Sequence, residues 1–151
     1  MAIRDFFGRA ARPVFVDTGA WIAIGDPTDA LAGEAVAAWR NLLVAGTPLV
    51  TTNLVVGEAY TLARTRHGYR AAWALLDLLD RTRRLARHHV TPQLEAQAYA
   101  ILRQYRDQPF SFVDATSFAF MRSAGIAEAF AFDVHFAAAG FTRIPTDRPV
   151  P

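Results

Sequence analysis

The apolar run Val14-Phe15-Val16, closed by Asp17 and Thr18, is the clearest strand signal in the chain. Such a nearly continuous apolar run is typical of a strand that is buried on both faces of a parallel sheet. Similar short runs alternate along the chain with segments of helical periodicity. This alternation predicts an α/β fold with a mostly parallel sheet.

The same patterns set the expected element boundaries. We expect further strands at residues 49–52, 129–132 and 141–144, and a weaker one at 84–90. Helices are expected over 29–45, 53–67, 69–79, 91–106, 111–124 and 135–139. Asn53 is the expected N-cap of the second of these helices.

Length and composition favour one globular domain with a core of its own. The chain has 151 residues, of which 52% are hydrophobic and 20% charged, and this balance argues against disorder. The absence of cysteine excludes disulfides and thiolate zinc sites. No apolar run reaches the length of a membrane span, so we expect a cytoplasmic protein. We expect a basic N-terminal arm (1–13), one domain (14–147) and a loose tail (148–151).

The charged residues suit a polyanionic substrate. All 16 basic residues are arginine, against 14 acidic residues. Guanidinium groups contact phosphate in a bidentate manner better than ammonium groups do. The arginine bias also fits a simple effect of genome composition.

Four carboxylates lie in apolar, element-forming surroundings: Asp17, Glu58, Asp114 and Asp133. Two of them follow predicted strands, and the other two lie in the early turns of predicted helices. These elements would place all four at the carboxyl edge of the sheet, where open α/β sheets bind ligands. An ionised carboxylate in apolar surroundings is costly unless it is paired, hydrogen-bonded or bound to a metal.

Local structural roles are the alternative for three of these acids. Ser111 and Asp114 have the spacing of a capping box, and Asp17 and Asp133 could each be helix N-caps. Glu58 is too far inside its helix to act as a cap. Several carboxylates that converge cannot all stay ionised, so the site requires either protonation or a cation. Oxygen ligands favour Mg²⁺ or Mn²⁺ over Zn²⁺, and such a site supports phosphodiester hydrolysis.

The motifs around these acids resemble those of the PIN-domain ribonucleases, and most closely the VapC-type toxins of toxin–antitoxin pairs. The residues that carry the resemblance are Val16-Asp17-Thr18-Gly19-Ala20, Thr52-Asn53 with Glu58, Phe112-Val113-Asp114-Ala115, and Phe132-Asp133 with Phe136. It covers roughly residues 14–144. It implies a Rossmann-like sheet with helices on both faces and strand order 3-2-1-4-5, homodimers, Mg²⁺-dependent RNA cleavage and an inhibitory antitoxin partner.

The resemblance also implies residue roles. Asp17 and Asp114 would be the principal Mg²⁺ ligands, with Glu58 and Asp133 as supporting acids and Thr18 bracing the site. Two positions depart from the family pattern. Gly19 stands where many relatives have serine, and Ala131 where a small polar residue often precedes the last aspartate.

Arg64 and His135 are further candidates for RNA contact. A surface or capping role is the favoured alternative for His135. The cluster Arg81, Arg83, Arg84 and Arg87 fits either an RNA path or a solvated face. The competing function is a catalytically weak PIN-fold module that binds RNA or protein. A phosphatase for small esters is disfavoured, because a second aspartate two residues after Asp17 is missing.

Overall fold

The structure is a computed structural model that describes residues 12–145. Most of the expected arm and all of the expected tail therefore lie outside the described residues. Within residues 12–145, no helix combines the length and the apolar character that a bilayer crossing requires.

Five parallel strands form one sheet in the order β3-β2-β1-β4-β5. They are β1 (Val14–Val16), β2 (Leu49–Thr52), β3 (Leu85–His88), β4 (Glu128–Phe130) and β5 (Thr142–Ile144). The central strand β1 is buried along its whole length, as its apolar sequence predicts. The strand order expected from the family resemblance is confirmed.

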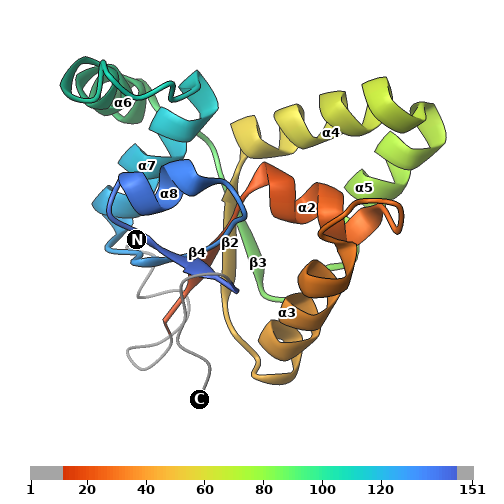
Figure 1. Cartoon of the computed structure of the whole chain (residues 1–151). Helices are drawn as coiled ribbons and strands as arrows, with labels where there is room; N and C mark the ends of the chain where they lie inside the picture. The colour runs from red at the N-terminus through yellow and green to blue at the C-terminus, as the bar shows by residue number, and fades with distance from the viewer. Residues whose placement is uncertain (1–11, 146–151) are drawn as a thin grey trace.

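Helices cover both faces of the sheet, as expected. They are α2 (Thr18–Gly25), α3 (Ala32–Val44), α4 (Asn53–His67), α5 (Tyr69–Arg81), α6 (Pro92–Gln104), α7 (Phe112–Ala124) and α8 (Val134–Ala138). Figure 1 shows α2, α3 and α5 on one side of the sheet and α7 and α8 on the other. The core between these layers is aromatic, with Phe15, Phe118 and Phe136 fully buried and Trp21 packed edge-on against Trp39.

The structure corrects several expected boundaries. Helix α2 was not expected, and its appearance ends β1 at Val16 instead of Thr18. Thr52, rather than Asn53, caps α4, because its side chain accepts the backbone N–H of Val55 at 3.3 Å. The Asn53 side chain instead accepts the backbone N–H of Val90 at 2.8 Å, which ties α4 to the segment after β3.

The last strands also differ in length from the expected ones. Strand β4 begins one residue early, at Glu128, and ends at Phe130 instead of residue 132. Strand β5 begins at Thr142, and β3 is shorter than expected at both ends. Because β4 ends early, a short connection separates it from Asp133, which becomes the N-cap of α8.

Candidate functional site

The carboxyl edge of the sheet carries the acidic residues. Asp17 follows β1 directly, and Asp133 lies just beyond the end of β4. Helix α4 begins where β2 ends and carries Glu58 in its second turn, and Asp114 lies in the first turn of α7. Since all strands run parallel, these chain segments approach the same edge of the sheet.

Asp17 is the most strongly perturbed acid of the site. Its side chain is only 6% exposed and makes no capping hydrogen bond, although the residue occupies the N-cap position of α2. Burial raises the pKa of Asp17 to about 7, although a hydrogen bond from the Thr18 backbone opposes the shift. The charges of Asp114, Asp133 and Glu58 raise it further. The four predicted acids therefore come together around Asp17.

Asp114 closes a capping box and also belongs to the acidic cluster. Its Oδ2 atom accepts the backbone N–H of Ser111 at 3.0 Å, while the Ser111 hydroxyl accepts the backbone N–H of Asp114 at 2.9 Å. This is a complete capping box. The same carboxylate is 9% exposed and acts electrostatically on Asp17, so the cap does not remove it from the acidic cluster.

His135 lies between two of the acids. Its Nδ1 atom is 3.1 Å from Asp114 Oδ2 and 3.3 Å from Asp133 Oδ1. Asp133 also caps α8, because its Oδ1 accepts the backbone N–H of His135 at 2.9 Å. The side chain of His135 is 21% exposed, and its ring packs edge-on against Phe110. His135 is therefore partly buried within the acidic cluster, and its contact with RNA stays a prediction.

Ligand atoms of Asp114, Asp133 and His135 all lie within 4.8 Å of one another, which is close enough to share a metal ion. An imidazole nitrogen thus joins the oxygen donors that the sequence predicted. The only sequence signal for it was its position two residues after Asp133. Two carboxylates about 4 Å apart repel by roughly 4 kcal/mol at an effective dielectric of 20. A divalent cation would relieve this repulsion, so the donor set fits one.

Two buried hydroxyls lie on the elements that carry these acids. Thr18 Oγ1 and Ser117 Oγ have no hydrogen-bond partner among the described residues. Thr18 directly follows Asp17, and Ser117 lies one helical turn after Asp114 in α7. Thr18 was expected beside Asp17 from the sequence, whereas Ser117 was not, because a serine within an apolar helix gives no signal of its own.

Arg64 lies farther from the acids, in the last turn of α4. Its guanidinium is 5.9 Å from the centre of the Tyr69 ring, at the start of α5. The structure therefore places Arg64 on the helix that carries Glu58, about 9 Å farther along its axis.

Comparison with known proteins assigns the family. Residues 14–142 match the model of the PIN domain. The chain belongs to the PIN-domain family. Among PIN-domain proteins, it is 44% identical over 133 residues to the 23S rRNA-specific endonuclease VapC20 of Mycobacterium tuberculosis, in two strains. This match spans 87% of the chain and 97% of the relative.

Solved PIN-domain structures agree. The crystal structure of VapC20 from Mycobacterium tuberculosis, described as a sarcin-ricin loop cleaving toxin, superposes with a TM-score of 0.76 at 42% identity. The superposition covers 85% of the present chain and 96% of the VapC20 chain. FitAcB from Neisseria gonorrhoeae matches with a TM-score of 0.61 at 14% identity over 86% of this chain and 95% of that chain, which shows a shared fold. The resemblance to VapC-type PIN-domain ribonucleases, and the expectation of a nuclease, are confirmed.

Proposed function

We propose that this PIN-domain protein is a Mg²⁺-dependent endoribonuclease and the toxin of a toxin–antitoxin pair. The observation that carries the proposal is the gathering of three further carboxylates around the buried Asp17. The 44% identical relative VapC20, whose name gives 23S rRNA as its target, makes ribosomal RNA the first substrate to test. Mn²⁺ is the alternative ion, since it accepts the same hard ligands.

Asp17 and Asp114 would be the principal metal ligands, with Glu58 and Asp133 in support. When bound, the cation would stabilise charge on the phosphate and lower the pKa of a water nucleophile. Asp114 is oriented for this role because Ser111 and His135 both hold its Oδ2 atom. That arrangement leaves Oδ1 of Asp114 for a ligand.

Neighbouring side chains would position the substrate. His135 is held by two carboxylates and would contact a phosphate oxygen beside the scissile bond. The buried hydroxyl of Thr18 is free to hydrogen-bond a water or phosphate group next to Asp17. Arg64, on the exposed end of α4, would contact the RNA backbone farther along the strand.

Two partner proteins belong to the same proposal: an antitoxin that blocks the acidic site, and a second copy of the chain in a homodimer. The alternative of a non-catalytic RNA- or protein-binding module is disfavoured. Such a module would have no need to keep four carboxylates together at an energetic cost.

The decisive experiment incubates the purified protein with intact ribosomes or 23S rRNA and maps new RNA ends by primer extension. Cleavage at discrete positions should require Mg²⁺ or Mn²⁺, disappear with EDTA and return when the ion is restored. Cleavage that continues in EDTA would overturn the metal assignment. Absence of cleavage on ribosomal, transfer and messenger RNA alike would favour the binding module.

A further inference from the structure

The turn between α4 and α5 carries an exposed pair of aromatic side chains. Tyr69 and Trp73 lie one helical turn apart on α5, so their side chains share one face of the helix. Their ring centres are 6.1 Å apart and their planes differ by only 19°, which is an offset stack. Tyr69 is 57% exposed and Trp73 is 56% exposed. Two stacked rings therefore lie outside the core.

Two cationic side chains contact the same turn. The Arg64 guanidinium lies 5.9 Å from the centre of the Tyr69 ring, in a cation–π contact. His67 Nε2 lies 2.7 Å from Asp26 Oδ2, and this pair joins the end of α4 to the end of α2. Among the described residues, Trp73 makes no ring or cation contact except the one with Tyr69. Trp73 is therefore the ring with a face left for a ligand.

The charge of this turn favours a polyanion. Residues 59–76 contain no acidic residue and three arginines: Arg64, Arg66 and Arg70. All three arginines are exposed, and none forms an ion pair with another residue of the range 12–145. Single-stranded nucleic acids bind to surfaces of this kind, because bases stack on aromatic faces while cationic groups hold the phosphates.

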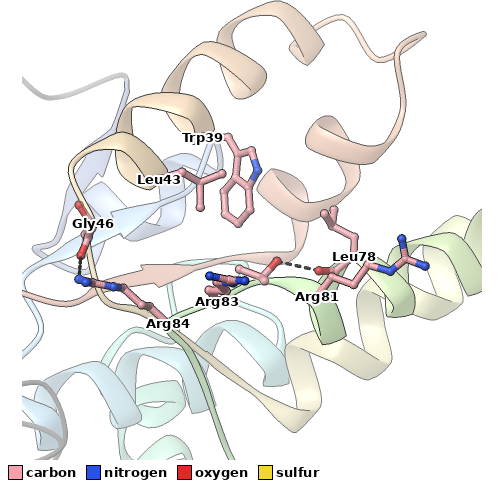
Figure 2. Close-up of a pocket in the computed structure, with 9 residues that line it drawn as sticks. Trp39, Leu43, Gly46, Leu78, Arg81, Arg83 and Arg84 are labelled. Atoms are coloured by element: carbon pink, nitrogen blue, oxygen red, sulfur yellow. Dashed lines mark hydrogen bonds between the residues drawn. The ribbon is translucent and has the colours of Figure 1, made fainter.

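The other basic surface of the molecule lacks these features. It is a groove of about 490 Å³ at the amino ends of the strands, and Figure 2 shows three arginines on its wall: Arg81, Arg83 and Arg84. Arg84 donates a hydrogen bond to the Gly46 carbonyl. Arg81 makes an ion pair with Asp77 at 2.8 Å. Trp39 beside them is only 8% exposed. Two of the three guanidinium groups are thus engaged, and the indole is covered.

Helix α4 connects the aromatic pair to the acidic edge of the sheet. It begins where β2 ends, carries Glu58 in its second turn and runs outward to the turn into α5 (Figure 1). His67, the last residue of α4, lies about 14 Å beyond Glu58 along the helix axis. An RNA strand that follows α4 would therefore pass from the acids to the aromatic pair.

We propose that Trp73, backed by Tyr69, stacks on an unpaired base of an RNA strand bound along α4, with Arg66 and Arg70 on the phosphates. The base belongs to a nucleotide away from the cleaved bond, so Trp73 is a positioning residue. The proposal rests on the ribonuclease function proposed above and adds a base contact to it. An acidic peptide fits less well, because its carboxylates would pair with the arginines but leave the indole without a planar partner.

The test uses intrinsic fluorescence, because Trp21 and Trp39 are buried and Trp73 is exposed. The full chain is titrated in EDTA with a 12-nucleotide oligoadenylate and with an abasic oligomer of the same length and charge. Oligoadenylate should quench the tryptophan emission, whereas the abasic oligomer should not, because it offers no base to stack. Trp73→Phe should remove the quenching, which assigns it to this side chain.

Fluorescence anisotropy of labelled oligoadenylate gives the affinity of each variant. Trp73→Ala should weaken binding at least about fivefold, the lower end of what one stacked base contributes. Trp73→Phe should weaken it less, because it keeps a ring. Arg70→Gln should weaken the binding of both oligomers, since it acts on the phosphates. The matched controls are Leu43→Ala and Arg40→Gln, which alter exposed side chains of α3 and should change the affinity less than twofold.

The proposal is overturned if oligoadenylate leaves the emission unchanged, if the abasic oligomer quenches it equally, or if Trp73→Ala binds as tightly as the wild type. It is also overturned if the controls weaken binding as much as Trp73→Ala, or if a 12-residue acidic peptide quenches Trp73 and displaces the oligoadenylate. The titration requires no cleavage. RNA cleavage without quenching would contradict the base contact alone, and quenching without cleavage would contradict the nuclease alone.

Discussion

Two aspartates at the acidic edge differ in what else they do. Asp17 makes no capping hydrogen bond, whereas Asp114 closes a capping box and also contacts His135. Replacing Asp17 therefore removes a candidate metal ligand, and the local contact that it affects is the hydrogen bond from the Thr18 backbone. Asn at position 114 can still accept the Ser111 N–H, so this substitution also preserves the fold.

We expect Asp17→Asn and Asp114→Asn each to lower RNA cleavage at least about 100-fold, the usual effect of removing one electrostatic catalytic group. Circular dichroism should show native spectra for both variants. The measurement is the single-turnover rate of cleavage at saturating Mg²⁺. Wild-type rates in either variant would remove that residue from the active site.

The raised pKa of Asp17 predicts an unusual pH dependence of stability without metal. The native pKa of about 7 exceeds the ordinary value of 3.8, so the native state holds a proton that the unfolded state releases. The free energy of unfolding should therefore fall between pH 4 and 7, by up to roughly 4 kcal/mol from this group.

The comparison with Asp17→Asn isolates this effect, because asparagine does not titrate. In EDTA, urea unfolding should find the two proteins similar near pH 4 and the variant more stable near pH 8. A wild type that is as stable as the variant at pH 8 would contradict the buried, perturbed state of Asp17.

At the scale of elements, the start of α7 connects stability to activity. Ser111 and Thr91 are comparable caps, because each accepts the backbone N–H three residues later, at 2.9 and 3.2 Å. Ser111→Ala and Thr91→Ala should each cost about 1 kcal/mol of stability. Only Ser111→Ala should also slow RNA cleavage, since it alone loosens the turn that holds Asp114. Equal cleavage by the two variants in a rate assay would argue against that coupling.

Helix α2 shows where sequence reasoning stops. Residues 18–25 are apolar almost all round, and Thr18, Ala20, Trp21, Ile22 and Ala23 are all buried. A short helix that is apolar and buried along most of its length has no clear amphipathic period, so its pattern cannot be told from a buried strand. Amphipathic α5 and capped α6, in contrast, were predicted close to their observed limits.

The residues of the candidate site also differ in how far the sequence predicts their positions. The acids could be found because strand ends and early helical turns of a parallel sheet share one edge. The contact between His135 and Asp114 could not be predicted from the sequence. It joins residues 21 positions apart and depends on how α7 packs beside α8. Local sequence contains no information about that packing.

For the molecule as a whole, the carboxylate cluster predicts that divalent ions stabilise the fold. At ten times the dissociation constant, Mg²⁺ or Mn²⁺ should add about 1.4 kcal/mol, or roughly 3–6 °C in Tm for a chain of this size. The shift should grow from pH 5 to pH 8 as Asp17 loses its proton. Thermal scans of the wild type and Asp17→Asn measure it, and an equal shift in the variant would place the ion elsewhere.

The sheet also separates two surfaces of opposite character. The acids lie at the carboxyl ends of the strands, and the groove with Arg81, Arg83 and Arg84 lies at the amino ends.

The double duty of Asp114 has a consequence for how descendants of such a protein would diverge. A lineage that no longer cuts RNA would still be under selection to begin α7 correctly, and so would tend to keep an aspartate after the serine. Asp17 makes no capping hydrogen bond and would drift earlier. Among degenerate copies, position 17 is therefore the more informative marker of whether the chemistry survives.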